Sequence, residues 1–222
     1  MKKASLGVII CCVVLSFVGC KPWTVVKNEK SNEDSSSKVY FESDDFDSEA
    51  FVKDVWDNKL LDYYNKKKVD IKKLVEDLKN DEVSAKEKYG LGSNEMGSNW
   101  TFIVEGNGKT LDVDTSSRAG VMSIDLEPFD GQSDLLIQIG PVIKGSSIRD
   151  SLDFIKLDNF SNQVEFASVS KEFNSTVVSE TISDNDYSKN IGKNITFMGC
   201  FTYANLDDIL VTPVELNAGE GQ

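Results

Sequence analysis

Two arginines are the residues of this chain best suited to hold an anionic or hydroxyl-rich ligand. Arg118 and Arg149 are the only arginines among 24 basic residues. A guanidinium group forms planar, bidentate hydrogen bonds that a lysine ammonium cannot form. Asp112, Asp114 and Asp150 lie near them in the sequence. One interpretation is a polar pocket in which both arginines hold a carboxylate, a phosphate or sugar hydroxyls. The other is a pair of structural Arg–Asp links that tie loops to the sheet.

The borders of two predicted strands favour a shared site for these arginines. Arg118 comes just before a strand predicted over 120–126, and Arg149 follows a strand predicted over 134–139. In an antiparallel meander the start of one strand and the end of the next lie at the same end of the sheet. We therefore expect the two guanidinium groups to converge, with Asp114 and Asp150 as the nearest anions.

Trp100 is a further candidate for ligand binding, because its ring could stack on a sugar. Trp100 opens a predicted strand, whereas Trp56 shares an apolar helix face with Val52, Val55, Leu60 and Tyr63. We expect Trp100 to be exposed and Trp56 to belong to the core.

Several kinds of chemistry are excluded or disfavoured. The chain contains no histidine, which excludes a His-based triad, a His zinc site and a His general base. Segment 125–131 resembles a calcium loop only superficially, because Phe129 occupies the fifth position and Gly131 comes one position late. We interpret it as a polar hairpin turn. We predict no catalytic residue, metal site or cofactor, and the net charge of −13 argues against nucleic-acid binding.

The N-terminus is typical of a bacterial lipoprotein precursor. Lys2 and Lys3 precede an apolar run over 6–18, which fits a signal peptide and is too short for a spanning helix. Gly19 and Cys20 then complete a lipobox-like sequence. We predict a signal peptide over 1–19, lipid attachment at Cys20, and a polar flexible tether over 20–40. A plain secretory signal and an uncleaved anchor are the alternatives.

Lipidation would leave Cys200 as the lone thiol of the mature chain, so no intramolecular disulfide is expected. Cys200 lies in the apolar run 195–201, and we predict that it is buried and inert.

Residues 41–95 are predicted to form a helical subdomain. Asp47 or Ser48 is a plausible N-cap of a first helix, Asp70 of a second, and Gly90 ends a short third helix.

From about residue 96 the pattern changes to strands. Segments 100–105 and 109–114 flank a Gly-Asn-Gly turn at 106–108, and further strands are predicted over 120–126, 134–139, 195–202 and 209–216. A short helix opens at Ser147, and a longer one runs over about 166–182. The fold class is therefore α+β. A small closed or partly open antiparallel barrel over 96–222, with an inserted helix, would leave no exposed strand edges.

Several stretches together resemble one bacterial family, the predicted periplasmic lipoproteins catalogued as domain of unknown function 2291. The stretches that carry the resemblance are 52–61 (VKDVWDNKLL), 88–90 (KYG), 112–120 (DVDTSSRAG), 136–152 (LIQIGPVIKGSSIRDSL), 159–167 (NFSNQVEFA) and 209–214 (ILVTPV). The resemblance implies a helical subdomain joined to an OB-like barrel, and genes beside sugar-uptake ABC transporter components. It implies no established activity and assigns no functional residue.

These observations predict a non-enzymatic, extracytoplasmic accessory lipoprotein, held at the membrane by the lipid on Cys20. It would bind a small polar ligand or a partner, such as a sugar ABC transporter component. The alternative is a structural or assembly factor whose helices dock on a membrane permease, and a hydrolase is the third hypothesis.

Overall fold

The computed structural model describes residues 46–92, 99–182 and 185–218. All of them belong to one compact unit that spans residues 40–222. The predicted division near residue 95 falls inside this unit, and helices and strands on both sides of it contribute to one hydrophobic core. The predicted signal peptide, Cys20 and tether lie outside the described residues. Among the helices described, none is both long and apolar enough to cross a membrane.

The first helix continues through a π-helical turn. Its segments are α1 (Ser48–Val55), η1 (Trp56–Leu60) and α2 (Leu61–Lys67). Asp47 is the N-cap, as predicted, and its carboxylate accepts a hydrogen bond from the Ala50 amide at 3.0 Å.

The π turn corrects the predicted apolar face. A π turn holds one residue more than an α turn, so the buried face moves by one position along the chain. Leu60 and Tyr64 are fully buried, whereas Tyr63 and Trp56 are only partly buried against the core. The prediction that Trp56 is a core residue therefore holds only in part.

The short strand β1 (Val69–Asp70) leads into a helical hairpin of α3 (Ile71–Asn80) and α4 (Glu82–Tyr89). The start of this hairpin after Asp70 and its end at Gly90 were predicted from the sequence. Asp70 caps α3 by accepting a hydrogen bond from the Lys73 amide at 3.0 Å. Gly90 ends α4, and a Cβ at this position would lie 2.3 Å from the Trp100 ring. A glycine is therefore needed there for close approach of the ring.

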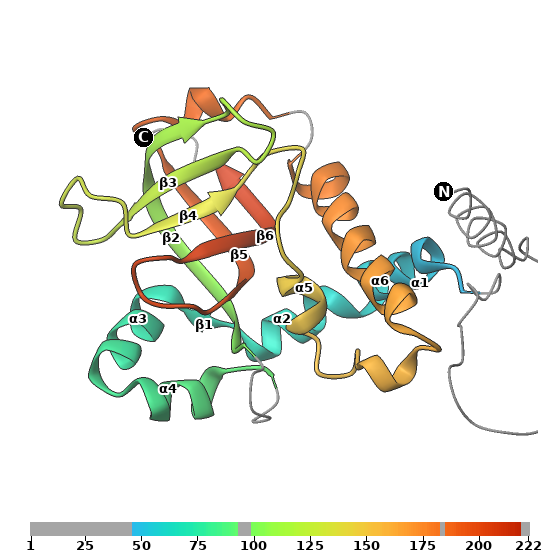
Figure 1. Ribbon diagram of the computed structural model, residues 1–222. Coiled ribbons are helices and arrows are strands. Elements are labelled where there is room, and N and C mark those ends of the chain that lie inside the picture. Colours follow the sequence, from blue (N-terminus) through green and yellow to red (C-terminus); the bar gives the residue numbers. More distant parts are fainter. Residues whose placement is uncertain (1–45, 93–98, 183–184, 219–222) are drawn as a thin grey trace, which may run out of the picture. The chain divides into compact units, whose positions relative to one another are not determined.

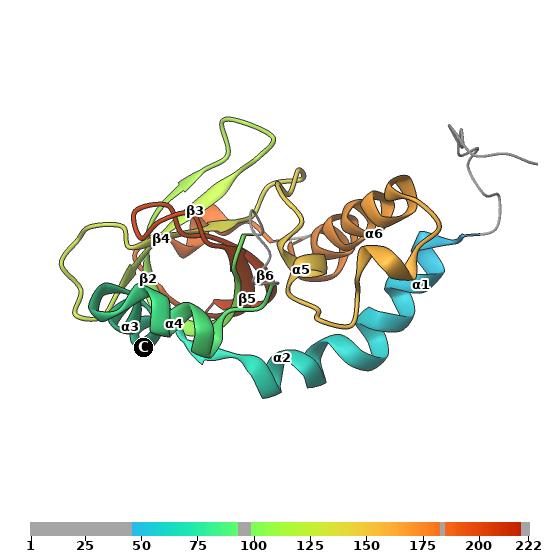
Figure 2. The same cartoon turned by 60° about the horizontal axis from the view of Figure 1, so that its bottom comes forward.

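Five strands close into a barrel. They are β2 (Thr101–Asp114), β3 (Val121–Leu126), β4 (Leu135–Gln138), β5 (Asn194–Thr202) and β6 (Leu210–Ala218). Their order is β2-β3-β4-β6-β5, and β5 pairs again with β2, which closes the ring (Figures 1 and 2). The predicted barrel is thus confirmed. The sixth strand of the sheet, β1, pairs in parallel with β2. The β4–β6 pair is parallel, which corrects the purely antiparallel arrangement.

The predicted hairpin at 106–108 is wrong. β2 runs unbroken through this segment, pairing with β5 over its first part and with β3 over its second. The two glycines serve close packing: a Cβ would lie 2.6 Å from Ile71 Cγ2 at Gly106 and 2.4 Å from Ile124 Cγ2 at Gly108. Small residues let this long strand change partners where the barrel wall is crowded.

Side chains on the two faces of the barrel wall have different neighbours. Met122, Ile137 and Val211 are neighbours in register and fully buried, as are Phe102 and Phe201. These rows fill the barrel interior.

The opposite row of side chains faces helices. It includes Ile103, Cys200 and Thr212, which are neighbours in register. The helices between β4 and β5 are α5 (Ser147–Asp150), α6 (Gln163–Thr176) and its π-helical continuation η3 (Val177–Ile182), together with the short 3-10 helices η2 (Leu157–Asn159) and η4 (Tyr187–Asn190). α5 packs on β5, and α6 packs on α1 (Figure 1). The predicted long helix begins three residues earlier than expected, at Gln163, directly after its N-cap Asn162.

Candidate functional site

Arg149 is held in a packed cluster between α5 and α6. Its Nε and one terminal nitrogen donate to the Asp150 carboxylate at 2.8 and 2.6 Å, and the other terminal nitrogen donates to the Phe166 carbonyl at 3.2 Å. The guanidinium carbon lies 3.7 Å from the Phe166 ring centre. Phe166 in turn contacts Phe160, which packs edge-on against Phe46. Only 13% of the Arg149 side chain is exposed. The donors of its guanidinium group are engaged in hydrogen bonds within the protein.

Arg118 has different surroundings. It is exposed on the β2–β3 connection, and its carbonyl accepts a hydrogen bond from the Val142 amide at 3.0 Å. Asp114, its expected partner, instead accepts from the Ser116 amide at 2.8 Å. Hydrogen bonds from Ser116 lower the pKa of the Asp114 carboxyl. Asp112, the third acid near the arginines, is exposed.

The two arginines therefore share no contact within the described part of the chain. Arg149 contacts Asp150, but the two are neighbours within α5, so this contact does not tie a loop to the sheet, and both interpretations of the arginines stay predictions. The pocket formed jointly with Arg118 finds no support in these contacts. Trp100, expected to be exposed, is partly buried against the core, and its carbonyl accepts from the Tyr203 amide at 2.8 Å.

Cys200 is fully buried, as predicted, and lies within a polar network under α5. Burial raises the pKa of its thiol to about 11, although hydrogen bonds with Tyr64, Ser147 and Ser151 act in the opposite direction. Because Ser151 Oγ donates to the Ile148 carbonyl, the Tyr64 hydroxyl is the donor in its 2.8 Å contact with Ser151. Burial also raises the pKa of Tyr64. A thiol held protonated in this way is a poor nucleophile.

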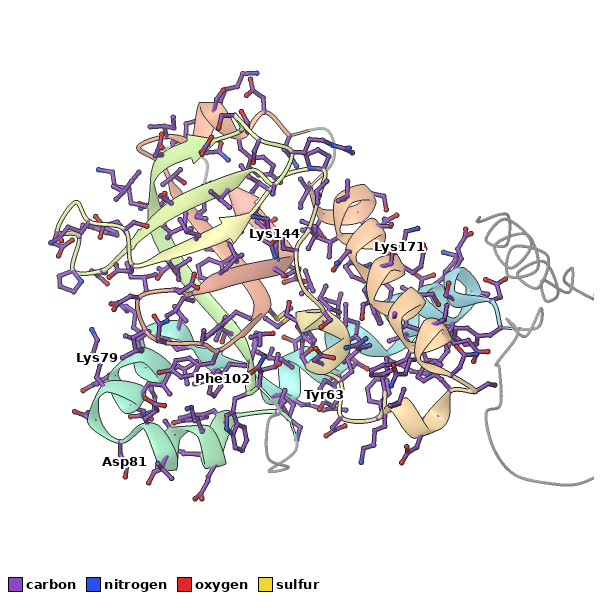
Figure 3. All side chains as sticks on the ribbon, viewed as in Figure 1. Tyr63, Lys79, Asp81, Phe102, Lys144 and Lys171 are labelled. Atoms are coloured by element: carbon purple, nitrogen blue, oxygen red, sulfur yellow. The ribbon has the colours of Figure 1, made fainter. Side chains whose placement is uncertain are left out.

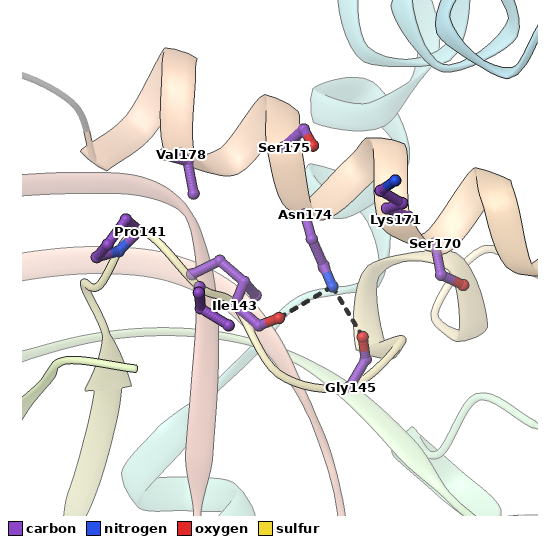
Figure 4. A pocket seen from close by; sticks show the side chains of 9 residues that line it. Pro141, Ile143, Gly145, Ser170, Lys171, Asn174, Ser175 and Val178 are labelled. Carbon is purple, nitrogen blue, oxygen red and sulfur yellow. Dashed lines mark hydrogen bonds between the residues drawn. The ribbon is translucent and has the colours of Figure 1, made fainter. Parts of the chain in front are cut away.

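The turn at 143–145 is fixed by two side-chain amides from distant parts of the fold. Gln138, at the end of β4, accepts from the Lys144 amide at 2.7 Å and donates to the Lys144 carbonyl at 3.2 Å. Asn174, on α6, donates to the carbonyls of Ile143 and Gly145 at 3.3 and 2.9 Å (Figure 4). Gly145 has a φ of +86°, which favours glycine. The backbone of this turn is therefore held from both sides.

The side chain of Lys144 is left free by this arrangement. It is exposed and has no ion pair with a described residue. Figure 3 shows Lys144 after β4 and Lys171 on α6.

A cavity of about 550 Å³ lies between this turn and α6, and we call it the α6 groove. Its apolar wall includes Pro141, Ile143 and Val178, and Lys171, Asn174, Ser170 and Ser175 supply its polar groups (Figure 4).

Two features of the α6 groove bear on ligand binding. The Ser170 hydroxyl is buried and has no hydrogen-bond partner among the described residues, which costs about 1–3 kcal/mol for such a group. The π-helical segment begins at Val177, beside the groove-lining Val178, and π turns frequently occur at functional sites.

The larger cleft between α3 and the β3–β4 and β5–β6 connections is a weaker candidate. Its volume is about 720 Å³, but several of the charged side chains that line it already form ion pairs or hydrogen bonds within the protein. Lys72 pairs with Glu127, and Asp130 and Asp134 accept hydrogen bonds from backbone amides.

The segment 125–131 within this region is a hairpin turn, as predicted. Asp125 is buried and accepts from the amides of Asp130 and Gly131 at 3.4 and 2.9 Å. Among the residues described, no group of three or more Cys, Asp or Glu side chains is placed to hold a metal ion.

Sequence reasoning missed Gln138, Asn174 and the two lysines. The stretch 136–152, which carries part of the family resemblance, contains both the turn and Gln138. Asn174 lies in a helix with no local signal, because its partners are about 30 positions away.

Comparisons with known proteins agree with this fold. A crystal structure of an OB-fold protein from Thermotoga maritima MSB8 has a TM-score of 0.64 and 18% identity, with 78% of this chain and 99% of that chain covered. Among curated proteins, none matches. The family described as predicted periplasmic lipoproteins, domain of unknown function 2291, matches residues 8–217, and the chain belongs to this family.

Proposed function

We propose that the protein is a non-enzymatic, membrane-anchored binding protein that holds a small anionic, hydroxyl-bearing ligand in the α6 groove. The observation that carries the proposal is the composition of this groove: one lysine, three polar side chains and no acidic side chain, in a chain of net charge −13. Its volume of about 550 Å³ is within the range of small-molecule sites.

The groups around the groove suit a sugar acid. Lys171 is exposed and would meet a carboxylate, while Ser175 and Asn174 would meet hydroxyls. Pro141 and Val178 offer an apolar surface for the less polar face of a sugar ring. A link to sugar ABC uptake, which the family resemblance implies, belongs to this proposal and fits such a ligand.

We propose no catalytic function because the side chains near the groove do not form a catalytic group. The chain has no histidine, and the thiol of Cys200 is buried with a raised pKa. Lys171 is the one basic side chain among the residues that line the groove; it is exposed, and no hydrogen bond joins it to Ser170 or Ser175. A serine hydroxyl needs a hydrogen-bonded base to become a nucleophile.

The test is a thermal-shift measurement on the full-length protein in mild detergent, with glucose, gluconate and galacturonate as probes. A ligand at 100 times its dissociation constant stabilises the folded state by about 2.7 kcal/mol. We expect the two sugar acids to raise the melting temperature and Lys171→Met to abolish the shift. Lys193→Met is the matched control, since Lys193 is also exposed but is not among the groove's lining residues. No shift with any probe, or a shift that survives Lys171→Met, would contradict the proposal.

A second candidate function is docking on a membrane permease. Three large apolar side chains on the α5–α6 connection and the start of α6 are partly exposed to solvent, by 42% for Phe154, 41% for Leu157 and 62% for Val164. Exposed apolar residues of this kind occur at protein contacts. Loss of a crosslinked membrane partner on Phe154→Ser and Leu157→Ser, with sugar-acid binding unchanged, would favour this function.

A further inference from the structure

A second cavity lies on the other side of the 143–145 turn, against the β5–β6 connection. Its volume is about 200 Å³, and Gly145 lines both this cavity and the α6 groove. We call it the β6 pocket. The side chains of Gln138, Ser147 and Thr212 line it and are at least nine-tenths buried. The exposed side chains that line it include Lys144 and Asp208.

The buried side chains of the β6 pocket form a continuous hydrogen-bonded chain. Gln138 Nε2 donates to Thr212 Oγ1 at 2.8 Å, and Thr212 Oγ1 lies 2.9 Å from Ser147 Oγ. Since the Gln138 amide also holds the Lys144 backbone, the same residue builds the polar wall and fixes the position from which Lys144 projects. The pocket wall is thus preorganised before any ligand arrives.

The two charged groups of the pocket have opposite signs and come from different segments. Lys144 lies on the turn after β4, and Asp208 lies on the β5–β6 connection. No ion pair within 4.0 Å joins them, and neither forms an ion pair with another described residue. Two exposed, oppositely charged groups on one cavity can each hold one end of a ligand that carries both charges.

We propose that the β6 pocket binds a small zwitterion, such as an amino acid. Lys144 would contact its carboxylate and Asp208 its ammonium group. The cavity volume of about 200 Å³ equals about six or seven water molecules at about 30 Å³ each, which restricts the ligand to a few heavy atoms. A net-neutral ligand also avoids long-range repulsion by a chain of net charge −13. This inference goes beyond the proposed function and does not rest on it.

Isothermal titration calorimetry of the full-length protein in detergent tests the inference. The probes are glycine, β-alanine and γ-aminobutyrate, whose charge separation increases in that order. Acetate and methylammonium carry each charge alone. We expect one of the zwitterions to bind at least tenfold more tightly than either single-charge probe. Failure of all three to bind would overturn the inference.

Variants locate the site and separate it from the α6 groove. Lys144→Met and Asp208→Asn should each weaken zwitterion binding at least tenfold. The double exchange Lys144→Asp with Asp208→Lys should restore part of it, because both charges are again present. Lys171→Met, in the neighbouring groove, is the matched control and should leave zwitterion binding unchanged.

Two outcomes would contradict the β6 pocket as a separate zwitterion site. One is equal weakening by Lys144→Met and Lys171→Met. The other is tight binding of acetate alone, which would assign Lys144 to an anion site. Gluconate binding that is lost in Lys171→Met but kept in Lys144→Met would leave the proposed function standing whichever result the zwitterions give.

Discussion

The cluster around Arg149 and the turn at 143–145 use charged residues in opposite ways. In the cluster, the charged side chain is itself the structural element. The Arg149 guanidinium donates hydrogen bonds to Asp150 and to the Phe166 carbonyl, and it lies over the Phe166 ring. At the turn, neutral amides hold the backbone, and Lys144 projects without an ion pair among the described residues. A cation whose donors are already used contributes to stability, whereas a cation on a fixed backbone is available for a ligand.

Replacement of the two arginines gives the largest expected contrast. Arg149→Lys loses one of the two donors to Asp150 Oδ1 and the bond to the Phe166 carbonyl, so we expect the free energy of unfolding to fall by about 2–3 kcal/mol. Arg118→Lys, at an exposed position, should change it by less than about 0.5 kcal/mol. Urea denaturation measures both values. Similar losses for the two variants would mean that Arg118 has a structural role that its exposed position does not indicate.

Alkaline pH probes the buried network that lies near the turn. The thiol of Cys200 has a pKa of about 11 in the folded protein, against 9.0 as its ordinary value. The unfolded chain therefore loses this proton first, and the stability that the group contributes below pH 9 is lost as the pH rises to about 11.

The loss from this one group is of the order of 2 kcal/mol. Denaturation curves at pH 8, 9, 10 and 11 should show a smaller decline for Cys200→Ala than for the parent protein. Parallel declines would show that the thiol is ionised equally in both states.

Replacement of the amides should weaken the turn in order of their burial. Gln138→Leu leaves the Lys144 amide and carbonyl and the Thr212 hydroxyl without this partner, and we expect a loss of about 2 kcal/mol. Asn174→Leu removes bonds at the groove surface and should cost about 1 kcal/mol. Urea denaturation provides the measurement. If Asn174→Leu proved the more costly, α6 rather than the barrel would be the principal support of the turn.

Removal of the lysines should have the smallest effect on stability. Lys144→Met and Lys171→Met are each expected to change the free energy of unfolding by less than about 0.5 kcal/mol, because neither forms an ion pair with a described residue. Thermal unfolding in the absence of ligand is the measurement. A loss near that of Arg149→Lys would remove the distinction between the two regions.

Local signals in the sequence were sufficient for many elements of this fold. Asp47 and Asp70 cap helices because a carboxylate can accept a hydrogen bond from an amide three residues later. The alternating apolar pattern located most of the barrel strands, and the apolar surroundings of Cys200 predicted its burial. These features depend on contacts between residues close in the sequence, or on the two-residue period of a strand. Both can be recognised in the sequence itself.

The candidate site was decided by contacts between distant segments. Gln138 and Thr212 are 74 positions apart, and Asn174 reaches carbonyls about 30 positions away. The unbroken strand β2 replaced a predicted hairpin because its partners, β3 and β5, come from different parts of the chain. Such pairings depend on which segments the closed barrel brings together. The conformational preferences of single residues do not specify these pairings. Only the tertiary structure therefore distinguished Arg149, which is held in a packed cluster, from Lys144 and Lys171, which lie beside the two cavities without an ion pair to a described residue.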